Sequence, residues 1–126
     1  MIERKEYLED LISFKDKKLI KVITGIRRCG KSTMLELFQT YLKENGIEDE
    51  QITTVNLEDG DYRGIRTSEA LYEYVESKLI NNKKNYVFLD EVQQVKNFQE
   101  AVDWLYAKKN VDLYITGSNA FLLSGE

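Results

Sequence analysis

The sequence predicts an α/β protein built on a parallel sheet, and two observations carry that prediction. Short β-prone runs alternate with segments of helical periodicity along the chain, as expected when helices connect parallel strands. Each cluster of polar residues suited to chemistry follows directly after one of the β-prone runs. Because ligands of open parallel sheets bind beyond the carboxyl ends of the strands, we expect these clusters to meet at one edge of the sheet.

The expected elements follow from apolar periodicity and from residues that begin or end helices. A leading amphipathic helix is expected over residues 2–16. Next come a buried strand over 19–24, a polar loop, and a helix that starts near Lys31 and stops at Asn45-Gly46. The alternation continues with strands over 52–57, 86–91 and 111–116, and with helices that begin near Thr67 or Ser68 and near Phe98.

Composition excludes several kinds of site. The chain has no histidine, which excludes imidazole bases, Ser–His triads and histidine-ligated zinc. Its one cysteine, Cys29, excludes an internal disulfide and a cysteine metal cluster, and this usage fits a reducing compartment. The formal net charge of −4 gives no general attraction to nucleic acid or to an anionic membrane, so neither partner is indicated.

Length and hydropathy bound the organisation of the chain. The 126 residues fit one domain, with a leading helix over 1–17 and a core over 18–126. No apolar run approaches the roughly 20 residues of a membrane span. The N-terminus is too charged for a signal peptide, so the cytoplasm is the expected location.

Residues 25–32, GIRRCGKS, match the pattern G-x-x-x-x-G-K-[ST] at every fixed position. Glycines let the backbone turn tightly, so that successive N–H groups point at one anion, and the following helix adds a partial positive charge. Lys31 is expected on the β- and γ-phosphates, the Ser32 hydroxyl on Mg²⁺ and Thr33 beside the α-phosphate. The candidate nucleotide-binding residues are Gly25, Ile26, Arg27, Arg28, Cys29, Gly30, Lys31, Ser32 and Thr33.

Arginines occupy two of the variable positions in this loop, Arg27 and Arg28. The simpler interpretation is that they point to solvent or pair with an acid. Contact with phosphate, base or a partner is the alternative, and the sequence assigns them no role.

A carboxylate pair, Asp90-Glu91, ends the apolar run YVFL. A polar strand end would explain such a pair, but the phosphate loop upstream favours a nucleotide hydrolase. In that chemistry Asp90 holds Mg²⁺ through water and Glu91 orients and partly deprotonates the attacking water. We therefore take Glu91 and Lys31 as the candidate catalytic residues, and Ser32 and Asp90 as the metal-binding ones.

The position of Glu91 distinguishes two reaction classes. A small-molecule kinase passes its phosphoryl group to a substrate and needs no water-activating glutamate here. The strand over 52–57 lies between the phosphate loop and the carboxylate pair. That order is typical of the P-loop ATPases that carry a catalytic glutamate.

Two further polar clusters follow strands. The fourth strand leads into Gly-Ser-Asn, where Ser118 and Asn119 are candidate sensors of the γ-phosphate, although Gly-Ser-Asn is also ordinary turn chemistry. Thr116 is still inside that strand. Arg63 and Arg66 lie in the loop after the second strand; a surface loop is the simpler interpretation, and an arginine finger acting on a neighbouring subunit is the alternative.

Three segments together, VITGIRRCGKSTML, YVFLDEVQ and YITGSNAFLLSGE, resemble the prokaryotic AAA-type P-loop ATPases that are usually fused to a C-terminal domain of unknown function. The resemblance covers essentially the whole chain. It implies a three-layer core with strand order 5-1-4-3-2 and ATP as the nucleotide. It also implies phosphate binding by 25–33, Mg²⁺ support by Asp90, catalysis by Glu91 and sensing by Ser118 or Asn119.

Members of that family continue past LLSGE into a fifth strand, an arginine-bearing segment and the C-terminal domain. The chain is therefore expected to be a truncated domain with order 1-4-3-2, in which LIKVIT is an exposed edge. Exposed edges recruit other chains, so we expect a tendency to form homo-oligomers. Without the catalytic arginines of the missing segment, turnover is expected to be weak.

Three functions are compatible with these patterns. The favoured one is Mg-dependent ATP hydrolysis that drives a conformational change in a larger protein with an unknown target. The second is a nucleotide-dependent interaction module with little hydrolysis. The third, a small-molecule P-loop kinase, is disfavoured by Glu91 and by the intervening strand.

Overall fold

The computed structural model describes residues 2–23 and 31–117. Its helices are α1 (Ile2–Phe14), α2 (Lys31–Glu44), α3 (Ser68–Lys78) and α4 (Phe98–Tyr106). Its strands are β1 (Lys21–Ile23), β2 (Ile52–Asn56), β3 (Asn85–Asp90) and β4 (Val111–Thr116). Short 3₁₀ turns precede β2 (η1, Asp49–Gln51) and follow β2 and β3 (η2, Gly60–Tyr62; η3, Val92–Gln94). The predicted alternation of strands and helices is confirmed.

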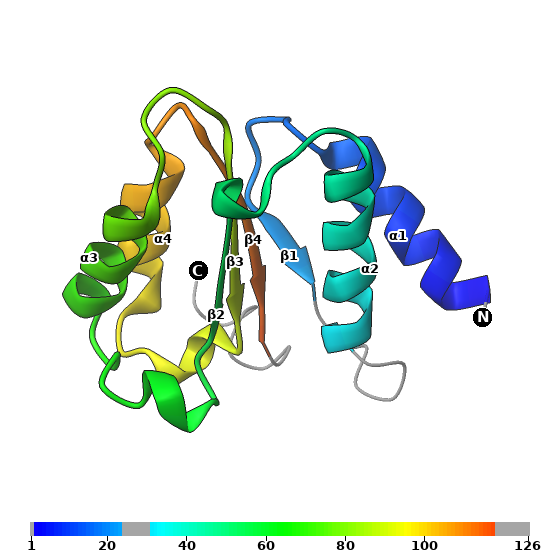
Figure 1. Ribbon diagram of the computed structural model, residues 1–126. Coiled ribbons are helices and arrows are strands. Elements are labelled where there is room, and N and C mark those ends of the chain that lie inside the picture. Colours follow the sequence, from blue (N-terminus) through cyan, green and yellow to red (C-terminus); the bar gives the residue numbers. More distant parts are fainter. Residues whose placement is uncertain (1, 24–30, 118–126) are drawn as a thin grey trace.

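The strands form one parallel sheet in the order β1-β4-β3-β2, which is the predicted order. Helices α1 and α2 cover one face and helices α3 and α4 cover the other, so the described part has three layers (Figure 1). Within it, β1 and β2 are the two edge strands. The α/β class and the three-layer core are therefore confirmed.

The central strands are buried on both faces, as is typical of parallel sheets. In β3, Tyr86 and Phe88 pack in the cluster under α1 and α2, whereas Val87 and Leu89 pack in the cluster under α3 and α4. Strand β4 alternates in the same way, and its Tyr114 ring stacks on Phe88 with 4.8 Å between ring centroids. Side chains of even number in β3 and β4 thus face α1 and α2.

Residues predicted to begin or end helices do so at the start of α3 and at the end of α2. The Thr67 hydroxyl accepts a hydrogen bond from the Ala70 amide at 3.1 Å and caps α3. Helix α2 ends at the predicted Asn45-Gly46 pair, where Gly46 has a φ of 96° and the Ile47 amide donates back to Leu42 at 3.0 Å.

Boundaries at the start of the chain differ from the prediction. Helix α1 ends at Phe14 and not at residue 16, because Asp16 has a left-handed φ of 65° and its amide donates to the Asp112 carboxylate at 2.8 Å. Strand β1 begins at Lys21 and not at residue 19, because the Leu19 amide donates to Lys17 in a tight turn.

A buried polar network fastens this turn to the amino edge of the sheet. The Asp112 carboxylate, on a residue 2% exposed, accepts hydrogen bonds from the Lys21 ammonium, the Asp16 amide and the Tyr114 hydroxyl. The Tyr86 hydroxyl donates to the Asp16 carboxylate at 2.8 Å. These bonds satisfy the buried charges and fix the path of the chain from α1 into β1. Among the described helices, none is long and apolar enough to cross a membrane.

Candidate functional site

The carboxyl ends of the four strands lie at one edge of the sheet, and α2 begins at the same edge (Figure 1). Asn56 at the end of β2 is the register partner of Asp90 at the end of β3. The last register pair of β3 and β4, Leu89 with Ile115, places Asp90 beside Thr116. This is the edge at which the sequence predicts the site.

Asp90 is held in a fixed position at this edge. It is 6% exposed, and one of its carboxylate oxygens, Oδ1, accepts a hydrogen bond from the Thr116 hydroxyl. Its carbonyl accepts from the Leu57 amide at 3.0 Å. Because Asp90 and Thr116 have even numbers in their strands, both side chains face the layer of α1 and α2.

Glu91 departs from the strand. Its backbone is left-handed, with φ 56° and ψ 53°, a region that a non-glycine residue adopts at a cost of about 1–3 kcal/mol and that is enriched at active sites. A continued strand would send this side chain to the α3 and α4 face, opposite to Asp90. Its amide donates to the Thr116 hydroxyl at 2.9 Å, and its carboxylate accepts from Gln93 Nε2 at 2.9 Å.

Two of the residues around the carboxylate pair were missed by sequence reasoning. The sequence favours Ser118 and Asn119 over Thr116, which is still inside its strand, and it gives no indication for Gln93. The side-chain amide oxygen of Gln93, Oε1, is buried and has no hydrogen-bond partner among the described residues. A signal for Thr116 was available, because the last polar residue of a strand beside β3 is the residue best placed to contact Asp90.

The predicted phosphate loop is described only at its end. Lys31, Ser32 and Thr33 are the first residues of α2, so they occupy a helix N-terminus at the site's edge, and only their backbone is described. The other predicted site residues lie outside the described residues: Gly25, Ile26, Arg27, Arg28, Cys29, Gly30, Ser118 and Asn119.

The arginines after β2 bind their own loop. Arg66 Nη1 donates to the carbonyls of Ile65 at 2.9 Å and Leu57 at 3.3 Å. Arg63 Nη1 donates to the Gly60 carbonyl at 2.8 Å. These contacts favour a structural role for both guanidinium groups over the arginine-finger alternative.

The Asp90 carboxylate is a type of ligand that suits Mg²⁺. Among the described residues, no group of three or more acidic or cysteine side chains could hold a metal alone. Mg²⁺ needs no such cage, because it keeps several waters and binds through one or two protein oxygens together with substrate phosphates. The Asp90 carboxylate at this edge is one protein oxygen of that kind.

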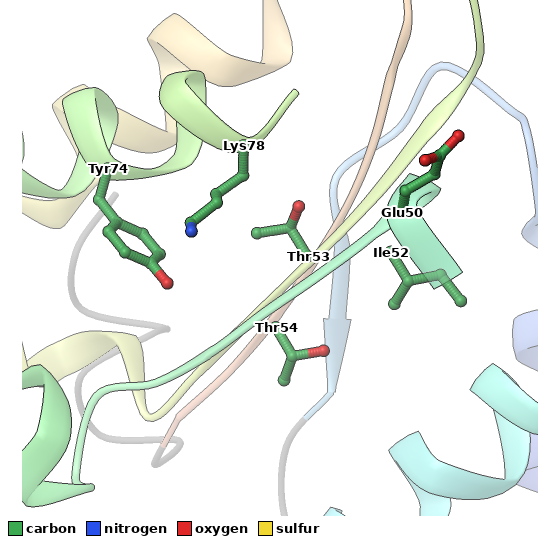
Figure 2. A pocket seen from close by; sticks show the side chains of 6 residues that line it. All are labelled: Glu50, Ile52, Thr53, Thr54, Tyr74 and Lys78. Atoms are coloured by element: carbon green, nitrogen blue, oxygen red, sulfur yellow. The ribbon is translucent and has the colours of Figure 1, made fainter. Parts of the chain in front are cut away.

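A pocket of about 380 Å³ lies away from this edge, along the free side of β2. Figure 2 shows its lining side chains, with Tyr74 and Lys78 of α3 reaching toward the strand. The lining residues are Glu50, Ile52, Thr53, Thr54, Tyr74 and Lys78. None of the predicted site residues is among them, so this pocket is separate from the candidate site.

Comparison with known proteins identifies the family. The family model described as an AAA domain matches residues 17–126, which is most of the chain. The chain belongs to this AAA domain family. Membership confirms the resemblance seen in the sequence and indicates a nucleotide-binding domain of the P-loop ATPase type.

Relatives of this AAA domain include two curated proteins, both called uncharacterized. One, from Haemophilus influenzae, is 42% identical over 127 residues, which cover all of this chain and 32% of the relative. The other, MJ1637 from Methanocaldococcus jannaschii, is 28% identical over 130 residues, which cover 96% of this chain and 27% of the relative. The chain thus spans about a third or less of these relatives. No solved structure matches.

Proposed function

We propose that this AAA domain binds ATP with Mg²⁺ at the carboxyl edge of its sheet and hydrolyses it. The observation that carries the proposal is the pair Asp90 and Glu91, held by one buried hydroxyl at the edge where α2 begins. Residues 25–33 bind the phosphates in this account, with Lys31 on the β- and γ-phosphates. Ser118 and Asn119 are the proposed γ-phosphate sensors.

Each side chain of the pair has a distinct task. Thr116 engages Asp90 Oδ1, so Asp90 Oδ2 would hold Mg²⁺ through water, and the Ser32 hydroxyl would bind it directly. Bound there, Mg²⁺ would neutralise charge on the β- and γ-phosphates. Glu91 accepts a proton from the water that attacks the γ-phosphorus, while the bridging P–O bond breaks and ADP leaves.

One contact favours the second candidate function, a nucleotide-dependent interaction module with little hydrolysis. The Glu91 carboxylate already accepts a hydrogen bond from Gln93, and a base engaged in this way is less available to water. The attacking water must then bind the carboxylate beside Gln93 or replace it. Such domains occur in larger proteins. The target of the domain and the process that hydrolysis drives depend on those proteins.

The substitution Glu91→Gln tests the proposal. It keeps the shape of the side chain and removes the base, so we expect ATP affinity to change by less than about threefold and hydrolysis to fall by about 10²-fold or more. The measurements are Mg-ATP binding and single-turnover hydrolysis, with protein in excess over ATP so that slow turnover is detected.

The matched control is Glu58→Gln, which neutralises an exposed carboxylate in the loop after β2. This control should behave as wild type in both measurements. Intact binding with unchanged hydrolysis in Glu91→Gln would show that Glu91 is not the base. A wild-type rate no greater than that of ATP without protein, with intact binding, would favour the interaction module.

A further inference from the structure

We propose that Thr116 is a positioning residue, whose hydroxyl joins β4 to β3 and holds Asp90 and Glu91 in the arrangement that hydrolysis needs. This proposal rests on the proposed function, because it concerns the same carboxylate pair. It assigns a role to a residue over which the sequence favours Ser118 and Asn119.

The hydroxyl of Thr116 contacts both members of the pair. The residue is 1% exposed, Oγ1 donates to Asp90 Oδ1, and Oγ1 accepts from the Glu91 amide at 2.9 Å. A threonine hydroxyl has a single proton, and here that proton makes the hydrogen bond to Asp90. Thr116 therefore acts on a nucleotide through Asp90 and Glu91, and this separates its role from that of a γ-phosphate sensor.

The bond to Asp90 orients the carboxylate. A hydrogen bond to an ionised group is stronger than a neutral one, and it holds Oδ1 against β4. The branched Cβ of threonine also restricts χ1, so the position of Oγ1 is well defined. The position of Oδ2 is then determined by the sheet, and we expect it to set the affinity for Mg²⁺.

The bond to Glu91 supports the left-handed backbone. At φ 56° the Glu91 residue has left the β ladder, and its amide finds an acceptor in the Thr116 hydroxyl. Without that acceptor, a partly buried donor would be left unpaired in a conformation that glutamate seldom adopts. The turn would relax, and the Glu91 carboxylate would move away from the edge that it shares with Asp90.

Two substitutions at position 116 test the role. Thr116→Val keeps the shape and removes the hydroxyl, and Thr116→Ser keeps the hydroxyl. We expect the valine variant to lower the single-turnover hydrolysis rate by about tenfold or more and to raise the Mg²⁺ concentration for half-maximal rate several-fold. Its affinity for ATP without Mg²⁺ should change by less than about twofold, and serine should restore both properties to within about threefold of wild type.

The control is Thr53→Val, which makes the same change at another buried threonine, on β2 and in the wall of the separate pocket. It should leave the rate and the Mg²⁺ dependence unchanged. A purely structural role for Thr116 predicts instead a lower melting temperature with no shift in Mg²⁺ dependence, and that result would overturn the proposal.

Hydrogen exchange at the Glu91 amide provides a readout that needs no nucleotide. The amide should be protected in wild type and in Thr116→Ser, and should exchange about tenfold faster or more in Thr116→Val. If the valine variant does not fold, an unprotected Glu91 amide in wild type overturns the proposal and a protected one supports it.

Two activity results separate this role from the proposed function. A wild-type chain that neither binds nor hydrolyses Mg-ATP overturns both. A wild-type chain that is active, with the same activity in Thr116→Val, overturns this role alone.

Discussion

Two tyrosine hydroxyls near the amino edge of the sheet make the stability of the fold depend on pH. Burial and the hydrogen bond to Asp16 raise the pKa of Tyr86 above its ordinary value near 10. Burial and the charge of Asp112 raise the pKa of Tyr114 in the same direction. A raised pKa in the folded state means that the neutral hydroxyls stabilise the fold fully below pH 10, and that stability is lost above it as the unfolded chain ionises.

We therefore predict that the free energy of unfolding falls as pH rises from about 10, by up to about 1.4 kcal/mol per pH unit for each of the two tyrosines. Tyr86→Phe removes one ionisation and should give a shallower slope than wild type. Urea unfolding measured in steps from pH 8 to pH 11 compares the two slopes. Equal slopes for wild type and Tyr86→Phe would show that Tyr86 does not ionise on unfolding in this range.

Strand β1 is an edge strand of the described sheet. It pairs with β4 on one side, and in the described residues no strand pairs with its other side. Val22 is 52% exposed and the adjacent Leu19 is 50% exposed. An apolar edge of this kind pairs readily with another chain, which is the basis for the homo-oligomer expected from the sequence.

We predict that the 126-residue chain associates through β1 at high concentration and that Val22→Lys reduces this association. A lysine on an edge strand opposes pairing, because it places a charge where a second strand would pack. Sedimentation velocity over a concentration series measures the effect. Leu37→Lys is the matched control, since Leu37 is 39% exposed on α2 and not on the edge strand, and should leave the association unchanged. A wild-type chain that stays monomeric throughout contradicts the prediction.

At the scale of the whole molecule, local patterns were sufficient for the element order. Helix α4 carries Phe98, Ala101 and Leu105 at helical spacing, and all three are buried as that spacing predicts. The run YVFL is buried on both faces, as a central parallel strand must be. The strand order did not follow from local patterns; it came from the family resemblance, because the neighbours of a strand are chosen by packing across the whole sheet.

Local patterns also predict part of the site, and contacts between distant residues determine the rest. Asp90 and Glu91 stand out because charged residues end an apolar strand. The left-handed backbone of Glu91 does not stand out, because glutamate has no preference for it and its stabilising partner, Thr116, is 25 residues further along the chain. Gln93 was missed because its contact with Glu91 depends on that same turn.

The carboxyl edge of this sheet is the proposed binding site for Mg-ATP. Calorimetric titration of the chain with ATP and with GTP, each with and without Mg²⁺, tests this proposal. We predict one saturable ATP site that weakens by about tenfold or more when Mg²⁺ is removed, a weaker response to GTP, and loss of binding in Lys31→Ala. A folded wild-type chain with no ATP binding, or with binding that survives both Mg²⁺ removal and Lys31→Ala, would contradict the account.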